Sequence, residues 1–211
     1  MEILIKESSD LYRAIYDVVA DENIYFSERS QVCNCICSMS TEHSSSILTL
    51  AAHGYHISAA GMLRLQFEAL IRAIWVWFIA SDQAVSKFTL PLSRESLQAA
   101  KNLPGVNDML KALLNSNEIP KPMLETLENF QSKLLKDLHS LVHSGLLPVA
   151  LYSEGVPESM QVVTIKNSNL LVVLAGAMMG FLTQSHSVMQ EMNNIPRRFE
   201  SCLPGPAIYH G

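Results

Sequence analysis

The segment between residues 64 and 77 constrains the fold most, because it is almost entirely apolar and yet carries three charges at regular steps. Arg64, Glu68 and Arg72 are spaced four residues apart, and on an α-helix this spacing places them on one stripe. Apolar side chains fill almost every other direction around the axis, and such a helix is normally buried. Buried charges are rare unless they are paired. The sequence therefore predicts a central helix, from about residue 57 to about 80, that carries a charged ladder into the interior.

Apolar residues recur at helical spacing along most of the chain, which predicts an all-α fold. We expect a helical bundle of four to five long helices with short connecting helices. The best strand candidate, residues 161–165, is short and solitary. One helical-bundle domain over residues 1–195 is expected, followed by an extended C-terminal tail over 196–211 that is rich in proline and glycine. The helices are expected at residues 7–20, 27–53, 57–80, 93–101, 106–114, 123–145 and 167–193.

Three local features predict breaks between these helices. The Ser/Thr-rich stretch 38–46 favours a break or kink in the second helix. Gly145 is a natural C-terminal cap for the long helix that starts near residue 123. Residues 148–163 contain Gly155 and Pro157 and show little periodicity, so they predict a loop that includes one helical turn at most.

Charge and hydropathy argue against a strongly basic nucleic-acid-binding protein, a secreted protein and a membrane protein. The formal net charge is −5, so no global basic field draws the chain onto nucleic acid, although a local basic groove remains compatible with it. The N-terminus lacks the pattern of a signal peptide. Residues 62–80 are long enough to span a membrane but carry three charges, and residues 170–182 are too short. We therefore expect a soluble, cytoplasmic protein with no membrane partner.

Three of the four cysteines alternate within five residues, at Cys33, Cys35 and Cys37, and the fourth is Cys202. No Cys-x-x-Cys pair occurs, which argues against a zinc ribbon and a thioredoxin-like motif. On a helix Cys33 and Cys37 would share a face. Two interpretations remain open: small buried side chains, or a soft-metal or redox site.

The charged ladder has two interpretations as well. Glu68 lies within reach of both arginines, but one carboxylate cannot neutralise two guanidinium groups in a dry bundle. Either the stripe is partly exposed or paired with acids on other helices, or an anionic ligand such as phosphate supplies the missing charge.

A second cluster lies near the end of the long helix that starts near residue 123. His139 and His143 are one turn apart and share a face with Lys136, and the face flanks the apolar arc of that helix. The histidines fit a structural or capping role, general acid–base or substrate contact, or metal binding. His53 and His56 could add metal ligands, but no Glu-x-x-His pair supports a di-iron site. No cofactor motif occurs.

The two clusters together resemble a known group of proteins. A helix with Arg-x3-Glu-x3-Arg-x2-Trp, followed by a later helix that ends in His143-Ser144-Gly145, resembles uncharacterised bacterial all-α proteins that are similar to the HEPN superfamily. The resemblance covers roughly residues 42–145. It implies a helical bundle, often dimeric, of the kind found in toxins, antiviral defence proteins and RNA-cutting domains.

In catalytic members of that superfamily, an arginine and a histidine on one helix cleave RNA without a metal. The resemblance assigns the histidine to His143. The arginine of the motif is absent, because Lys136 stands seven residues before His143 and is followed by Asp137. Lysine keeps the charge but lacks the fork that binds phosphate through two bonds. Arg64 or Arg72 could substitute from the central helix.

These observations give two leading hypotheses. The first is a metal-independent ribonuclease of a toxin or defence system, with RNA or a nucleotide as ligand. Its candidate catalytic residues are His143, His139, Arg64 and Arg72, and its candidate binding residues are Glu68, Lys136, Asp137 and Ser144. The alternative is a non-catalytic binding module, in which the ladder is structural or holds a nucleotide, another small anion or a protein partner. A metal-dependent bundle enzyme is a third hypothesis, and a homodimer is compatible with each.

Overall fold

The structure is a computed structural model that describes residues 1–143 and 145–205. Within these residues the chain forms eleven α-helices and two short 3-10 helices, with no strand, so the predicted all-α class is confirmed. The four longest helices are α1 (Glu2–Val19), α2 (Glu28–Ala52), α3 (His56–Phe78) and α10 (Glu158–Leu182). The other elements are α4 (Asp82–Val85), η1 (Ser86–Phe88), α5 (Arg94–Ala100), α6 (Val106–Leu114), α7 (Lys121–Lys133), α8 (Leu135–Val142), α9 (Leu146–Glu154), α11 (His186–Arg198) and η2 (Glu200–Cys202).

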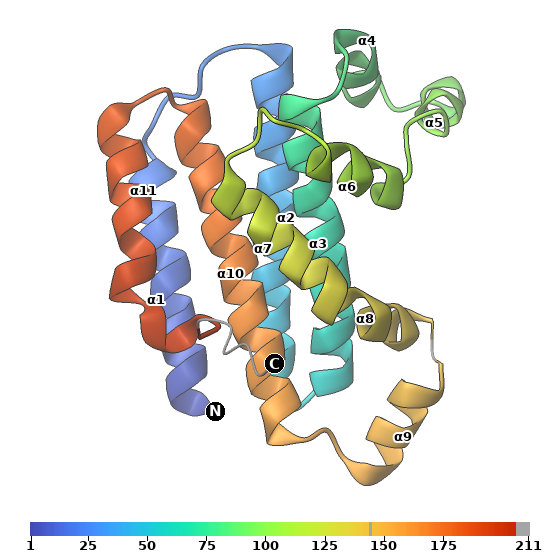
Figure 1. Cartoon of the computed structure of the whole chain (residues 1–211), viewed down its shortest axis with the longest axis vertical. Coiled ribbons are helices and arrows are strands. Elements are labelled where there is room, and N and C mark those ends of the chain that lie inside the picture. Colours follow the sequence, from blue (N-terminus) through green and yellow to red (C-terminus); the bar gives the residue numbers. More distant parts are fainter. Residues whose placement is uncertain (144, 206–211) are drawn as a thin grey trace.

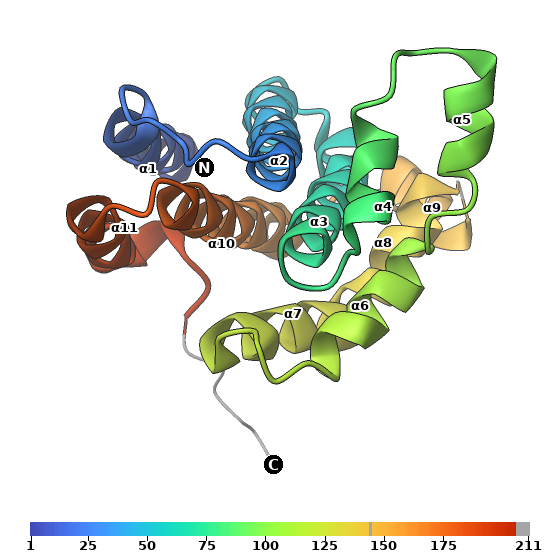
Figure 2. The same cartoon turned by 90° about the horizontal axis from the view of Figure 1, so that it is seen from above.

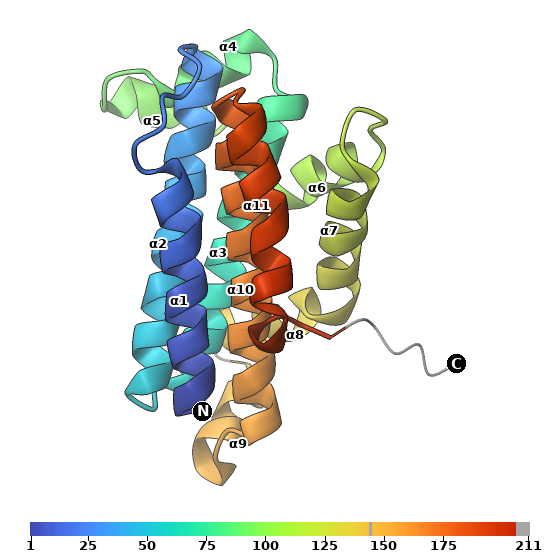
Figure 3. The ribbon, with the colours of Figure 1, turned by 90° about the vertical axis from the view of Figure 1, so that its left-hand side faces the viewer.

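Helix α10 lies at the centre of the arrangement. It packs against α1 and α11 on one side and against α2 and α3 on the other (Figures 1 and 2). Helices α6 and α8 pack on α3, and α7 continues from α6 along the same side of the bundle. Seen from the side of α1 and α11, the long helices run nearly parallel to one another, and α9 extends beyond their lower end (Figure 3).

Helix α3 is the core helix that the sequence predicts. Its buried residues point in most directions around the axis, and Phe67, Leu70, Ile71 and Ile74 have no exposed surface. The charged stripe does not enter the interior, however, because the side chains of Arg64 and Glu68 keep 19% and 29% of their surface exposed. The stripe therefore lies at the edge of the core. This agrees with the interpretation that the stripe is partly exposed.

Several predicted boundaries are wrong. The helix expected over 123–145 is interrupted at Leu134, where the backbone leaves helical geometry (φ −121°, ψ −32°). The segment 148–163 is not a loop, because it forms most of α9 and the first turns of α10, which also contain the strand candidate 161–165. The last long helix ends at Leu182, and Gln184 takes a positive φ of 56° to reverse the chain before α11.

Helix α2 runs without a break through the Ser/Thr-rich stretch. Its hydroxyl groups donate hydrogen bonds to carbonyl oxygens of the same helix, for example from Ser38 to Asn34 at 3.0 Å and from Thr49 to Ser45 at 2.9 Å. Such bonds satisfy the side chain without interrupting the backbone ladder. The expected break was therefore wrong.

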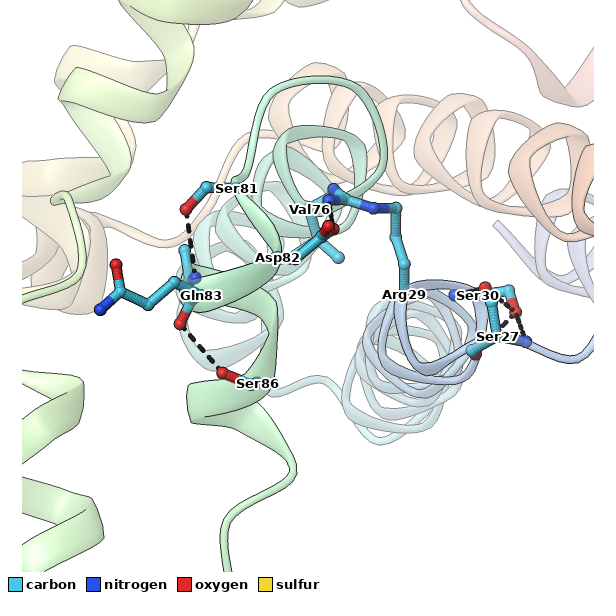
Figure 4. A network of polar contacts seen from close by, with 9 residues as sticks. Ser27, Arg29, Ser30, Val76, Ser81, Asp82, Gln83 and Ser86 are labelled. Carbon is cyan, nitrogen blue, oxygen red and sulfur yellow. Dashed lines mark hydrogen bonds and ion pairs between the residues drawn. The ribbon is translucent and has the colours of Figure 1, made fainter.

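Polar contacts fix the start of α2 against the end of α3 (Figure 4). Ser27 and Ser30 form a reciprocal capping box, which satisfies free N–H groups at the first turn. Arg29 then donates hydrogen bonds to the carbonyl oxygen of Val76 and to Asp82, the latter at 2.6 Å. These bonds connect three helices at one end of the bundle.

The C-terminal segment is not an extended tail from residue 196. Helix α11 continues through Pro196 to Arg198, and the 3-10 helix η2 follows. Cys202 and Leu203 are buried in a small apolar cluster with Leu11 and Ile195. Residues 206–211, the rest of the predicted tail, lie outside the described residues.

One helix among the described residues, α10, is long and apolar enough to cross a membrane. More than half of its apolar window, 56%, is buried inside the bundle. Its buried Ser168 forms a hydrogen bond with α3, and its buried Asn169 forms hydrogen bonds with α1 and η2. These contacts favour the role of a core helix, as expected of a soluble protein.

Two glycines give opposite predictions for alanine substitution. A Cβ atom at Gly176 on α10 would lie 2.6 Å from Cγ2 of the buried Ile15 on α1, whereas a Cβ at Gly61 on α3 would meet nothing within 4 Å. Gly176→Ala should lower the free energy of unfolding by about 1–3 kcal/mol through overpacking. Gly61→Ala should raise it by about 0.5–1 kcal/mol through helix propensity. Urea unfolding curves measure both, and shifts of the same sign would contradict the packing of α1 on α10.

Candidate functional site

Arg64 connects the charged stripe to the histidine face. Its Nε donates a hydrogen bond to Oε1 of Glu68 at 2.7 Å, one turn further along α3. Its Nη1 lies 2.5 Å from Nδ1 of His139 on α8. Helices α3 and α8 pack against each other and bring the two clusters of the sequence together. The structure thus shows a direct contact between residues that are 75 positions apart.

The contact determines which ring nitrogen of His139 carries its proton. A guanidinium group has only N–H donors, so Nδ1 of His139 must accept the hydrogen bond from Arg64. With Nδ1 as the acceptor, the ring carries its N–H on Nε2. This arrangement leaves the Nε2–H group as a hydrogen-bond donor for another molecule.

His143 completes the cluster at the end of α8. Its ring centroid lies 4.5 Å from that of His139, and the two ring planes are inclined by 58°. The four-residue spacing places both rings on one face of α8, and both side chains are exposed to solvent. The cluster therefore presents two imidazoles and a guanidinium group at the surface.

The remaining predicted site residues are not brought into this cluster by any hydrogen bond or ion pair in the described part of the chain. Arg72 is half-buried on α3, one turn beyond Glu68. Lys136 and Asp137 are exposed in the first turn of α8. Ser144 lies outside the described residues. Arg64, Glu68, His139 and His143 are thus the part of the prediction that the structure assembles.

Metal binding has little geometric support in the described residues. They contain no group of three His, Cys, Asp or Glu side chains that could hold a metal ion. His53, which the sequence offers as a further ligand, contacts the carbonyl oxygen of Thr49 on its own helix through Nδ1, at 2.8 Å.

Two of the three alternating cysteines, Cys33 and Cys37, behave as small core side chains. Cys33 and Cys37 are fully buried, Cys35 is exposed, and all are free thiols. The thiol of Cys33 contacts the carbonyl oxygen of Ala73 at 3.4 Å. A hydrogen bond with Cys33, together with burial, raises the pKa of Cys37 well above its usual range. A thiol held in its protonated form is a poor metal ligand and a poor nucleophile. This favours the interpretation as small buried side chains over that as a soft-metal or redox site.

Helix α9, which follows the histidine cluster, carries an apolar surface that the sequence pattern did not lead us to predict. Leu146, Val149 and Tyr152 expose 86%, 62% and 86% of their surface. Their three-residue spacing places them near one another on the helix, and this spacing is the signal that could have identified them. Gly155 and Pro157 instead predict a loop over most of this segment.

The fold is all-α, and the cluster joins the half-buried Arg64 and Glu68 on α3 to the exposed His139 and His143 at the end of α8. Residues 37–205 match the family described as a family of unknown function (DUF6988). The match spans more than half of the chain and contains every candidate site residue, so the chain belongs to this family. No curated protein and no solved structure matches the chain significantly.

Proposed function

We propose that the protein is a metal-independent ribonuclease of the HEPN-like kind, with its active site at Arg64, His139 and His143. The observation that supports this proposal is the hydrogen bond from Arg64 to His139, with the His143 ring 4.5 Å from that of His139. Two imidazoles and a guanidinium group at the surface are suited to acid–base cleavage of a phosphodiester. A bacterial toxin or defence system in the cytoplasm is the setting that accompanies this proposal.

The proposed reaction is an internal transfer that needs no metal. The neutral imidazole of His143 takes the proton of a ribose 2′-hydroxyl, whose oxygen forms a bond to phosphorus. The imidazolium of His143 then returns the proton to the 5′-oxygen as the P–O5′ bond breaks, which yields a 2′,3′-cyclic phosphate and a 5′-hydroxyl. The Nε2–H of His139 and the guanidinium of Arg64 stabilise the negative charge on the phosphate oxygens. Arg72, on the same stripe, is our candidate for contact with a neighbouring phosphate.

RNA cleavage in the presence of EDTA tests the proposal. The wild-type protein should cleave single-stranded RNA, and His143→Ala should lower kcat/KM about 10²–10⁴-fold. His186→Ala, which removes an exposed histidine from α11, is the matched control and should leave the rate unchanged. The products should carry cyclic phosphate ends. RNA that stays intact with excess protein from about pH 5 to about pH 9 would rule the proposal out, as would full activity of the His143 variant.

A second candidate function is a non-catalytic interaction module, in which the cluster is structural or holds a small anion. Two observations favour it: Glu68 already pairs with Arg64 at 2.7 Å, and Leu146, Val149 and Tyr152 form an exposed apolar surface next in sequence. A protein partner or a second copy of the chain could cover this surface. Analytical ultracentrifugation of the wild-type protein and of Tyr152→Glu tests whether a second copy of the chain binds this surface. A wild-type protein that stays monomeric at every concentration would exclude such a homodimer.

A further inference from the structure

A cavity of about 540 Å³ lies between α1, α2 and α10, away from the histidine cluster. Its lining comes from residues 12–24 at the end of α1 and the loop after it, residues 34–45 of α2, and Met179 and Thr183 near the end of α10. Helix α8 lies beyond α3 on the other side of the bundle, as Figures 1 and 2 show. The volume is in the range of small-molecule sites. The residues of this cavity are used neither by the proposed ribonuclease nor by the apolar surface of α9.

The serine and threonine hydroxyl groups of the cavity lining already donate their protons to backbone carbonyl oxygens. Ser38 donates to the carbonyl oxygen of Asn34 at 3.0 Å, and Thr41 donates to that of Ser38 at 2.8 Å. Ser45 and Thr183 likewise donate to carbonyl oxygens of their own helices, at 3.4 Å and 2.7 Å. A hydroxyl has one proton and two lone pairs. These four oxygens therefore offer hydrogen-bond acceptors to whatever occupies the cavity.

The charged and aromatic residues of the lining match this acceptor-rich character. Glu22 and Glu42 add two carboxylates, and none of the lining residues is a lysine, arginine or histidine. Tyr12 and Tyr16 add two aromatic rings from one face of α1. Carboxylates and aromatic faces both attract cations, and a tyrosine ring attracts them most strongly where water is excluded. The cavity thus combines hydrogen-bond acceptors, negative charge and π-faces.

Apolar side chains form the rest of the lining. Ile15, Val19, Ile24 and Met179 contribute to it, and Ile15 and Met179 are buried parts of the core. An occupant must therefore bring apolar surface as well as positive charge, because a small hydrated ion would leave this part of the cavity unfilled.

We propose that the cavity between α1, α2 and α10 binds a small organic monocation, with an ammonium or guanidinium group on an apolar body. Its N–H groups donate to the hydroxyl oxygens of α2 and to Glu42, and its apolar body lies against the tyrosine rings and Met179. A neutral ligand of the same shape would lack the attraction to Glu22 and Glu42, and an anionic ligand would be repelled by them.

The adjoining cavity explains why a single charge is preferred. A second space of about 440 Å³ shares Tyr12, Tyr16 and Ser45 with the first and is lined by Arg13. A ligand long enough to extend into it would bring its far end near the guanidinium group. A polyamine with charge at both ends is therefore repelled there, whereas a monocation is not.

Isothermal titration calorimetry with defined probes tests the proposal. 2-Phenylethylammonium should bind saturably with one site per chain, and its neutral analogue 2-phenylethanol should bind at least about tenfold more weakly. Glu42→Gln, which keeps the size of an exposed side chain, should weaken binding of the cation about 3–10-fold. Tyr12→Phe keeps the ring and should bind normally, whereas Tyr12→Leu should lose several-fold in affinity.

Glu125→Gln on α7 is the matched control, because it removes the same charge from an exposed position elsewhere in the bundle. It should leave the affinity unchanged. Four outcomes would each overturn the proposal. The first two are equal affinities for 2-phenylethanol and 2-phenylethylammonium, and equal affinities of the Glu42→Gln and Glu125→Gln variants for the cation. The other two are tighter binding of spermine than of 2-phenylethylammonium, and the absence of saturable heat with the cation. Since the titration uses no RNA, its outcome is independent of the test of ribonuclease activity.

Discussion

Phe67→Ala is expected to lower the free energy of unfolding by about 3–5 kcal/mol. Phe67 has no exposed surface, and its ring is stacked on that of Phe130 with centroids 4.2 Å apart and planes inclined by 12°. The pair connects α3 to α7, so truncation removes buried apolar area and leaves a cavity between the two helices. The same substitution also removes an aromatic pair worth about 0.5–1.5 kcal/mol. Urea unfolding followed by far-UV circular dichroism measures the change.

Phe26→Ala is the matched control, because Phe26 exposes 84% of its surface. Its effect should stay within about 0.5 kcal/mol of wild type. A double-mutant cycle of Phe67→Ala with Phe130→Ala should show coupling, since the two rings touch. If Phe67→Ala cost less than about 1 kcal/mol, α7 would not pack on α3 as described.

Periodicity located the core helices α2 and α3, although it missed the first turns of α10. The apolar residues of α3 follow the helical repeat closely enough to locate the helix, and four-residue spacing placed Arg64 and Glu68 on one stripe. The same reasoning placed His139 and His143 on one face of a later helix, and the structure brings that face against Arg64. Spacing within a helix is a local property, so a single sequence contains it.

The breaks were harder to predict, because proline has different effects at different helical positions. Pro148 lies in the first turn of α9, where the backbone N–H groups have no acceptor within the helix, so that proline is tolerated. Pro157 occupies the N-cap position of α10. We assigned both to a loop, although each lies at the beginning of a helix. The interruption at Leu134 has no glycine or proline to mark it. The interruption therefore carries no residue type by which periodicity could have located it.

The depth of the charged stripe also depends on packing. Sequence alone predicts that Arg64 lies on a helix with apolar neighbours, but it does not show how far α8 covers that side. In the structure α8 leaves both Arg64 and Glu68 partly exposed. Both side chains therefore keep part of their surface in contact with solvent, which a fully buried ladder would not.

Gln66→Leu is expected to lower the free energy of unfolding by about 2–4 kcal/mol, although leucine has a similar volume and greater hydrophobicity. Gln66 on α3 is fully buried, and its Nε2 donates to the carbonyl oxygen of Ser168 on α10 at 2.9 Å. Its Oε1 accepts from the hydroxyl of Ser168 at 2.7 Å. That hydroxyl oxygen lies 3.0 Å from the hydroxyl of Ser44 on α2, which must be the donor because Ser168 has used its proton. The network thus joins the three central helices.

The loss of stability in Gln66→Leu arises from the polar groups of Ser168 that the leucine side chain cannot bind. In Gln66→Leu the buried hydroxyl of Ser168 loses the acceptor of its proton but keeps its contact with Ser44, and the carbonyl oxygen of Ser168 loses its side-chain donor. An unsatisfied buried polar group costs about 1–3 kcal/mol. Ser168→Ala removes one of these groups. The double variant should therefore lose about 1–2 kcal/mol less than the sum of the two single variants. Urea unfolding of all four proteins measures this coupling, and additive costs would show that the hydrogen bonds between Gln66 and Ser168 contribute little.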